Sequence, residues 1–323
     1  MKNYILFLRP HANARYEAEA VRLAASEAEA FLPGTQFEQD SESFGVPCLR
    51  FSAEPEKAAC LDRHSLLYML CEIRGDGSFA PALRARDDRV GRDLASILKY
   101  SGKTNESFTK LLLNMTQLSG AFSGDEKLSV LDPMCGRCTT LFTALNAGWD
   151  AYGCDTDRKA LDEACAYFKR YLEYHKLIHE TDTFSVTAAD GKGTPARRFR
   201  VYGSRAEQKQ RGGLSLCCAR LDARDAAAFG REKFHLIVCD LPYGVQHRGQ
   251  GAPVPELLEQ CLEGWYRCLK KGGAAGVSFN ANTFPRERAA EAFERAGFTV
   301  RETKLRHWVE QAITRDAVIA VKE

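Results

Sequence analysis

An aspartate followed by leucine, proline, tyrosine and glycine closes an apolar run in the second half of the chain. The run covers residues 234–239, and Asp240-Leu241-Pro242-Tyr243-Gly244 follow it directly. The proline removes a backbone donor and stiffens the loop, so the carbonyls of Asp240 and Leu241 stay available as acceptors. A carboxylate beside such a carbonyl would bind an exocyclic amine on a planar base, and Tyr243 would stack on that base. A generic turn would also accommodate Asp240 and Pro242, but it would not require the aromatic residue.

A strand, a loop of small residues and a helix start follow one another in residues 129–145, SVLDPMCGRCTTLFTAL. Nucleotide-like ligands bind to the backbone of such a loop and to the N-terminus of the helix after it. Gly136 allows the backbone to approach a ligand closely, and Thr139 or Thr140 begins a helix whose free N–H groups face that ligand. The loop lacks the G-x-G-x-x-G fingerprint, which argues against NAD or FAD.

Two more acids end later strands, at the edge where doubly wound sheets bind ligands. Asp155 ends its strand about 20 residues after the glycine loop, the position at which a carboxylate binds a ribose diol. Asp157 is the second acid there, and we expect it to cap the helix that begins at Arg158. Asp222 follows the third strand, where a carboxylate can accept a hydrogen bond from an adenine amino group. A helix or turn cap explains Asp222 equally well, and Asp225 is the second candidate.

The twelve cysteines do not indicate a disulfide framework. The chain is long, and most of its cysteines lie in apolar strand or helix contexts, as small buried hydrophobes do. Cys135 and Cys138 form a single C-x-x-C, without a second pair or a nearby pair of histidines. We therefore interpret them as small residues that fill a tight loop, in preference to a zinc or redox site, and we predict no metal.

Length and composition indicate an ordinary globular protein of about two domains, with 323 residues, 45% of them hydrophobic and 27% charged. A net charge of +2 means that any nucleic-acid affinity must come from local clustering. The first apolar run is soon interrupted by Arg9 and Pro10, and no later run approaches about 20 apolar residues. We therefore expect a soluble, cytoplasmic protein.

Residues 1–74 follow the order βαββαβ, which predicts a small α+β ferredoxin-like domain. The strand patterns cover 4–8, 36–39, 46–51 and 66–73, and the helical patterns cover 14–32 and 54–61. Residues 75–103 are rich in glycine, proline and charge without periodicity, so we predict an interdomain linker there.

Residues 104–323 alternate strands with helices, which predicts an α/β domain with a parallel sheet covered on both faces. The predicted strands are 129–131, 151–154, 216–221, 235–239, 274–279, 299–303 and 317–321. The predicted helices are 106–118, which Asn105 would cap, 139–147, 158–177, 255–269 and 285–296. Seven strands with a late antiparallel pair fit a Rossmann-like, doubly wound domain.

Two segments are candidates for substrate contact. Gly244 and the nearby His247 and Arg248 follow the Asp240 motif and could close over a base, although a lone histidine in such a loop is usually incidental. Residues 181–213 form a long basic insertion with Phe199 and Tyr202 among the cations. Such a composition suits a surface that tracks a nucleic-acid backbone and stacks bases, and a solvated loop is the alternative.

The motifs around Asp132 and Asp240 resemble those of S-adenosylmethionine-dependent amino-methyltransferases of the (D/N/S)PPY type. The resemblance covers residues 104–323 and is strongest to THUMP-associated tRNA guanine-N2 methyltransferases and related rRNA enzymes. Their motifs read DPMCGSG or DPFCGSG and NPPYG or DLPFG. This chain departs from the first motif at Cys138, which replaces the second glycine. The residues before the domain suffice for the ferredoxin-like piece of that family, but not comfortably for its THUMP module as well.

The resemblance implies a seven-stranded methyltransferase domain with S-adenosyl-L-methionine as cofactor. The implied cofactor-binding residues are Asp132, Pro133, Cys135, Gly136, Thr139, Asp155 and Asp222. The implied catalytic residues, which hold the target base, are Asp240, Leu241, Pro242 and Tyr243.

The implied reaction is methyl transfer to N2 of a guanine in structured RNA, with tRNA favoured over rRNA. Guanine presents N1–H and the amine side by side, and these two donors match the two oxygens of the Asp240 carboxylate. The alternatives are a DNA adenine-N6 methyltransferase and a non-catalytic RNA-binding protein that retains the fold.

Overall fold

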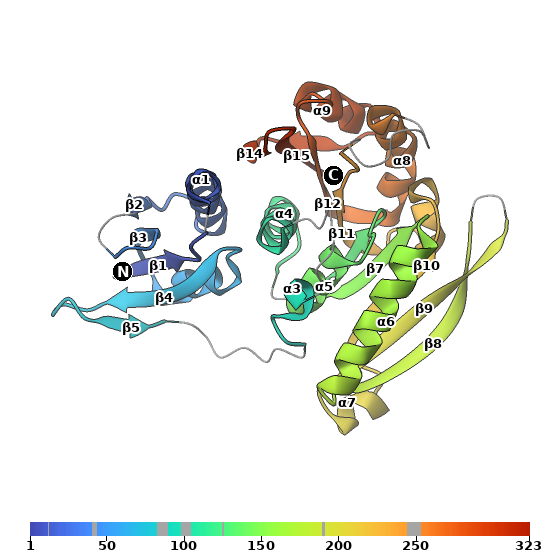
Figure 1. Ribbon diagram of the computed structural model, residues 1–323, viewed down its shortest axis with the longest axis horizontal. Coiled ribbons are helices and arrows are strands. Elements are labelled where there is room, and N and C mark those ends of the chain that lie inside the picture. Colours follow the sequence, from blue (N-terminus) through green and yellow to red (C-terminus); the bar gives the residue numbers. More distant parts are fainter. Residues whose placement is uncertain are drawn as a thin grey trace. The chain divides into compact units, whose positions relative to one another are not determined.

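The structure is a computed structural model that describes residues 1–11, 13–40, 44–82, 90–97, 105–124, 126–188, 191–243 and 253–323. The chain divides into two compact units (Figure 1). The first comprises Met1–Asp87 and Lys304–Arg315, and the second comprises Asp88–Thr303 and Asp316–Glu323. Among the described residues, no helix is both long enough and apolar enough to span a bilayer.

The first unit contains an antiparallel sheet in the order β2-β3-β1-β4-β5. Its elements are β1 (Lys2–Leu8), α1 (Ala14–Phe31), β2 (Glu38–Asp40), β3 (Cys48–Ala53), α2 (Pro55–Ala58), the 3-10 helix η1 (Ala59–Arg63), β4 (Leu67–Ile73) and β5 (Phe79–Pro81). The first four strands and the helical segments between them have the predicted ferredoxin-like arrangement, which is confirmed. Strand β5 extends the sheet by one strand beyond β4, with which it pairs.

A hairpin from the far end of the sequence also belongs to the first unit. Strand β14 (His307–Glu310) pairs antiparallel with the beginning of β15 (Ile313–Val321). The Arg22 guanidinium of α1 donates to the Lys304 carbonyl at 3.2 Å and to the Arg306 carbonyl. The Arg15 guanidinium lies 4.2 Å from the centroid of the Trp308 ring. Helix α1 therefore holds this hairpin through cations that bind carbonyls and an aromatic face.

A buried polar group joins α1 to the turn before β4. The Glu27 carboxylate accepts hydrogen bonds from the Ser65 amide at 3.0 and 3.1 Å and from the Ser65 hydroxyl. His64 Nε2 lies 3.3 Å from the same carboxylate and 3.0 Å from the Ala24 carbonyl. Glu27 and His64 are both fully buried, so water cannot replace any of these contacts.

We expect Glu27→Ala to lower the free energy of unfolding by about 3 kcal/mol, because it leaves the Ser65 donors and His64 buried without their carboxylate. Urea denaturation followed by circular dichroism measures the change. Glu29→Ala, at an exposed position of the same helix, is the matched control and should change stability by less than about 0.5 kcal/mol. Equal effects of the two substitutions would contradict the role given to Glu27.

The second unit contains the larger sheet, in the order β13-β15-β12-β11-β6-β7-β10-β9-β8. Its strands are β6 (Ser129–Asp132), β7 (Asp150–Asp155), β8 (Ile178–Thr187), β9 (Gly193–Tyr202), β10 (Leu214–Arg220), β11 (Phe234–Asp240), β12 (Leu269–Asn280), β13 (Thr299–Arg301) and β15. Strands β10, β7, β6, β11 and β12 run parallel to their neighbours in this series. Strand β15 pairs antiparallel with β13, and its last residues bond to the start of β12 through Lys322, Gly272 and Gly273.

The seven predicted strands are β6, β7, β10, β11, β12, β13 and β15, numbered 1 to 7 in chain order. Across the sheet, starting from β10, they follow one another as 3-2-1-4-5-7-6. The first five have the order of a doubly wound sheet, in which the chain turns to opposite sides of its first strand. The late antiparallel pair was also predicted. The second unit therefore has the Rossmann-like methyltransferase fold that the sequence predicted.

Helices cover both faces of this sheet. The main helices are α4 (Glu106–Ser119), α5 (Thr139–Asn146), α6 (Arg158–Tyr174), α8 (Val254–Cys268) and α9 (Arg286–Arg295), and the short ones are α3 (Leu94–Ile97), α7 (Arg205–Lys209) and the 3-10 helix η2 (Ala223–Phe229). The Asn105 side chain accepts from the Ser107 and Phe108 amides, so it caps α4 as predicted.

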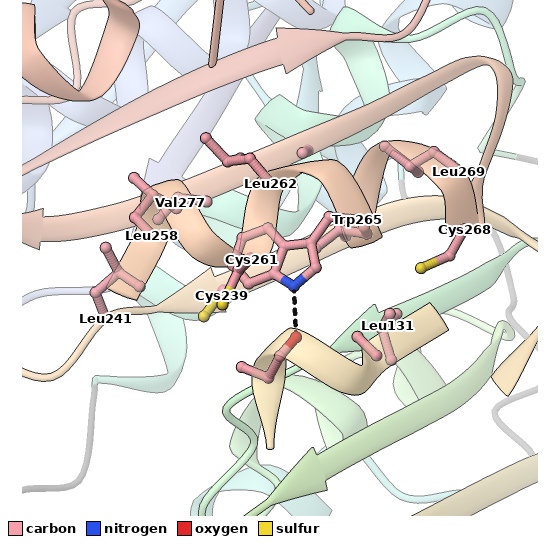
Figure 2. Close-up of a cluster of buried hydrophobic side chains, with 14 of the residues drawn as sticks. Leu131, Cys239, Leu241, Leu258, Cys261, Leu262, Trp265, Cys268, Leu269 and Val277 are labelled. Carbon is pink, nitrogen blue, oxygen red and sulfur yellow. Dashed lines mark hydrogen bonds between the residues drawn. The ribbon is translucent and has the colours of Figure 1, made fainter. Parts of the chain in front are cut away.

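One face of the sheet is covered by α8, α9 and η2. Trp265 of α8 is fully buried among side chains that include Leu131, Cys239 and Val277 of the central strands (Figure 2). Its indole N–H donates to the Ala223 carbonyl of η2 at 3.0 Å. The ring thus fills the core and its one polar atom is satisfied.

Helix α4 approaches β12 on the other face so closely that only a glycine fits there. A Cβ atom on Gly276 would lie 1.9 Å from the Thr116 hydroxyl oxygen. This contact fixes the distance between α4 and the strand that lies beside β11.

The basic insertion is a β-hairpin, and the hypothesis of a base-stacking surface is wrong for its two aromatic residues. Strands β8 and β9 add to the edge of the sheet at β10, and Phe199 and Tyr202 are only 2% and 3% exposed. The side chains of Arg198 and Arg200 bind Asp182 at 2.6 and 3.1 Å, and Arg197 binds Asp162 at 2.8 Å. The aromatic rings belong to the core, and each of these three cations is paired with one of two carboxylates, Asp182 or Asp162.

Candidate cofactor and substrate site

The predicted site residues lie at the carboxyl ends of the central parallel strands. Strand β6 has β7 on one side and β11 on the other, and the order of connections reverses between β6 and β11. Open α/β sheets bind ligands at this point. Asp132 ends β6, Asp155 ends β7 and Asp240 ends β11. The fold therefore brings three of the predicted acids to one edge of the sheet.

The loop after β6 is held by two of these carboxylates. The Met134 amide donates to Asp132 Oδ1 at 3.0 Å, and the Gly136 amide donates to Asp155 Oδ2 at 2.8 Å. Gly136 has a φ of +47°, and no atom lies within 4 Å of the place where a Cβ would stand. The glycine thus supplies the left-handed backbone of the loop and leaves space beside it for a ligand.

Cys135 attaches the same loop to strand β7. Its amide donates to the Cys154 carbonyl of β7 at 3.0 Å, and its side chain is buried. A Cβ on Gly153 would lie 2.8 Å from the Cys135 sulfur and 2.6 Å from Leu141. Cys135 is therefore a packing residue whose backbone, rather than its thiol, could contact a cofactor.

Asp132 is a buried acid whose pKa is raised to about 7. Burial is the main cause, and the negative charges of Asp155 and Asp240 raise the pKa further. Hydrogen bonds from the Thr140 hydroxyl and the Met134 amide oppose the shift. A buried acid with a raised pKa is a candidate functional residue. A positively charged ligand would reduce the repulsion between its carboxylate and those of Asp155 and Asp240.

The pKa of Asp132 predicts a pH dependence of stability. The folded state keeps the proton up to about pH 7, whereas an unfolded aspartate loses it at about pH 4. The folded state therefore binds more protons between these values, and this group lowers the free energy of unfolding as pH rises from 4 to 7. Asp132→Asn keeps the acceptor for Met134 and has no charge to bury. We expect it to exceed the wild type in stability at pH 8 by about 4 kcal/mol, since about three pKa units correspond to that free energy, and to match it at pH 4.

Urea denaturation of both proteins at several pH values between 4 and 8 measures this difference. A constant difference across the range would show that Asp132 does not titrate as its burial indicates.

Asp155 accepts hydrogen bonds from its own strand end as well as from the loop. Its Oδ1 accepts from the Asp157 amide at 2.8 Å. Asp157 in turn accepts from the Lys159 and Ala160 amides at 2.9 and 3.1 Å, so it caps α6 as predicted. A carboxylate has about four lone-pair sites, and the ribose role of Asp155 stays a prediction that this geometry accommodates.

Asp222 forms a bidentate pair with Arg224. The guanidinium donates to both carboxylate oxygens at 2.8 Å, and the Arg224 amide donates to Oδ1 at 2.9 Å. These hydrogen bonds lower the pKa of Asp222, and they make it the cap of η2. The capping interpretation is therefore confirmed. Binding of an adenine amino group by Asp222 stays a prediction, and the carboxylate already forms an ion pair with Arg224.

Asp240 is held by two hydroxyl groups that reach the same oxygen. The Tyr243 hydroxyl donates to Asp240 Oδ1 at 2.6 Å, and the Ser278 hydroxyl donates to the same atom. Ser278 lies on β12, directly opposite Asp240 in the register, and its carbonyl accepts the Leu241 amide at 2.9 Å. The Asp240 motif is thus fastened to the neighbouring strand at two successive residues.

Ser278 is a site residue that the sequence did not indicate. It lies within the apolar pattern of 274–279, and only the register between β11 and β12 places it beside Asp240. Ser278 is fully buried, which is unusual for a serine. In the sequence, the one available signal was a hydroxyl residue inside an apolar strand pattern. The predicted substrate residues Gly244, His247 and Arg248 lie outside the described residues.

Cys138 occupies a backbone conformation that favours glycine. Its φ is +68° and ψ is +25°, the left-handed region, at the residue before α5 begins with Thr139. An L-residue there costs roughly 1–2 kcal/mol. Its sulfur is fully buried, 3.8 Å from that of Cys218. Cys138 thus stands where the resembling motifs have their second glycine, and the backbone there has the conformation that glycine favours.

A matched pair of substitutions measures this conformational cost. Cys138→Ala and Cys138→Gly both remove the buried sulfur, but only glycine adopts the left-handed conformation without strain. We expect the glycine variant to be more stable than the alanine variant by about 1 kcal/mol in urea denaturation. The reverse order, which is usual for helical positions, would contradict the left-handed assignment.

All twelve cysteines are free thiols, and no group of histidines, cysteines and acids among the described residues has the arrangement of a metal site.

No protein-family model matches the sequence, and no curated protein sequence is significantly similar to it. Solved structures with a similar fold include TrmN from Thermus thermophilus, with 16% identity, a TM-score of 0.48 and coverage of 99% of this chain and 100% of that one. A TehB-like SAM-dependent methyltransferase from Corynebacterium glutamicum has 16% identity, a TM-score of 0.34 and coverage of 68% and 97%. The rRNA methyltransferase aviRa from Streptomyces viridochromogenes has 14% identity, a TM-score of 0.43 and coverage of 74% and 94%. At these identities, no residue role passes from these proteins to this chain.

Proposed function

We propose that this protein transfers a methyl group from S-adenosyl-L-methionine to an exocyclic amine of a nucleic-acid base. One observation carries the proposal. Asp132, Asp155 and Asp240 end adjacent strands at the point where the sheet order reverses, around a loop with an open glycine. The site is therefore strongly acidic at the place where a doubly wound sheet binds its ligand.

This charge favours a cationic cofactor over a phosphorylated one. The mutual repulsion of the carboxylates contributes to the raised pKa of Asp132, and a pyrophosphate would increase that repulsion. A sulfonium and an amino group would decrease it, and ribose hydroxyls would bond to Asp155. S-adenosylmethionine carries all three groups, and its sulfonium supplies an already electrophilic methyl group.

The residues of the Asp240 motif would orient the acceptor. The Asp240 carboxylate and the Leu241 carbonyl would each accept a hydrogen bond from an N–H of the amine, which would turn the nitrogen lone pair toward the methyl group. When bound, S-adenosylmethionine would supply the methyl group and leave as the neutral thioether, so the bond formed to nitrogen would replace the bond broken at sulfur. The methylated amine then loses one proton, for which Asp240 is the nearest base. The target base must be unpaired or extruded to reach this position.

We propose N2 of a guanine in structured RNA, with tRNA first among the candidates, as the methyl acceptor. The two motifs that resemble those of tRNA and rRNA guanine-N2 methyltransferases support this substrate. The ferredoxin-like domain at 1–74, a linker at 75–103 and the catalytic domain at 104–323 would then form a cytoplasmic RNA-modifying enzyme. A DNA adenine-N6 methyltransferase is the second candidate, because the same motif holds either amine.

The decisive experiment incubates the protein with labelled S-adenosylmethionine and, in separate reactions, total tRNA, rRNA and DNA. Nucleoside mass spectrometry then identifies the product. We expect N2-methylguanosine from tRNA. N6-methyladenine from DNA would replace the substrate assignment, and no transfer to any of the three would overturn the proposal.

Two substitutions distinguish the residue proposed to bind the cofactor from the residue proposed to bind the methyl acceptor. Asp155→Ala should weaken S-adenosylmethionine binding by about 10-fold or more in titration calorimetry, because it removes a charged hydrogen-bond acceptor. Asp240→Ala should abolish methylation and leave cofactor affinity within about threefold of the wild type. Glu263→Ala, at a position whose side chain is 83% exposed, is the control for general changes of surface charge. A parallel loss of binding and transfer in Asp240→Ala would show that Asp240 is structural.

A further inference from the structure

Asp240 Oδ1 accepts hydrogen bonds from the Ser278 and Tyr243 hydroxyls, and these two donors differ in how freely they can move away from it. Ser278 is fully buried on β12, lies opposite Asp240 in the register and is bonded through its carbonyl to Leu241. Removing its hydroxyl from the carboxylate would leave a buried donor without a partner. Tyr243 is partly exposed and lies in the loop after β11, three residues beyond the carboxylate that it binds. Water or a ligand can therefore reach the Tyr243 side chain, whereas the buried Ser278 is out of their reach.

The Tyr243 hydroxyl lies where the base would place a donor. A carboxylate oxygen has about two lone-pair sites, and the two hydroxyl donors match both sites on Oδ1. An amine or ring N–H that approaches Oδ1 therefore needs the site that Tyr243 holds. The guanine edge requires both carboxylate oxygens at once, so guanine cannot bind in full while the Tyr243 hydroxyl remains in place.

We infer that the Tyr243 hydroxyl stands in for a donor of the base on Asp240 and is exchanged for it when the base binds, whereas Ser278 is a positioning residue that keeps the carboxylate in place throughout. This inference rests on the proposed function. The exchange conserves the hydrogen bonds of Oδ1, because one donor replaces another. It also releases the tyrosine ring, which can then lie on the face of the base.

Opposite kinetic signatures follow for the two residues. Tyr243→Phe keeps the ring and removes the competing donor, so the KM for the nucleic acid should fall about threefold or more. Ser278→Ala removes the fixed donor, so kcat should fall about 10-fold with the cofactor Kd unchanged. Ser278→Thr restores a hydroxyl and should recover kcat to within about threefold of the wild type.

The controls are Tyr174→Phe, whose residue is 83% exposed, and Ser215→Ala on β10, and both should match the wild type. Thermal melting of each variant separates loss of fold from loss of positioning. A raised KM in Tyr243→Phe would overturn the exchange. Wild-type kcat in Ser278→Ala, or failure of the threonine variant to recover kcat despite a wild-type melting temperature, would overturn the positioning role.

These outcomes are distinct from failure of the proposed function, which would appear as absent transfer by the wild-type protein. In that case the exchange loses its basis as well.

Discussion

The burial of Asp132 between two other carboxylates is the constraint on which the rest of the second unit depends. Strand β6 is central in the sheet, so its last residue cannot reach bulk water, and its charge must be shared with amides and hydroxyls nearby. The Met134 amide and the Thr140 hydroxyl meet that need. The conformation of the loop after β6 therefore depends on its hydrogen bonds to the Asp132 carboxylate. The same carboxylate would attract a cationic ligand to the site.

This arrangement explains how the loop tolerates Cys138. Amide hydrogen bonds to Asp132 and Asp155 determine the path of the backbone, and the following residue must turn left-handed to start α5. Glycine would do so at no steric cost, whereas cysteine costs roughly 1–2 kcal/mol. The buried sulfur recovers part of that cost by packing beside Cys218. The loop retains its geometry although its sequence departs from the family pattern.

Most of the sheet could be predicted, because its parallel strands are apolar runs and three of them, β6, β7 and β11, end in an aspartate. Ser278 could not, because its role depends on a register between two strands that no local pattern specifies. The strands at 178–187 and 193–202 could have been predicted from the alternation of polar and apolar residues, but the basic composition of the segment drew attention away from that pattern. In β9, Arg198 and Arg200 alternate with Phe199 and Val201, so the cations face Asp182 and the apolar side chains face the core. Periodicity of two, weighed above basic charge, would have predicted a strand.

Under the proposed function, the state of Asp240 would bear on which base the protein selects. The match between guanine and a carboxylate assumes that both oxygens are available, yet Oδ1 already accepts two hydroxyl groups. A single amine, from guanine or adenine alike, needs only one acceptor besides the Leu241 carbonyl. Discrimination therefore depends on the energy of moving the Tyr243 hydroxyl, since a base with two adjacent donors gains a second hydrogen bond by displacing it and a base with one donor does not. Under the proposed function, Tyr243 would thus contribute to base selection through its hydroxyl as well as through its ring.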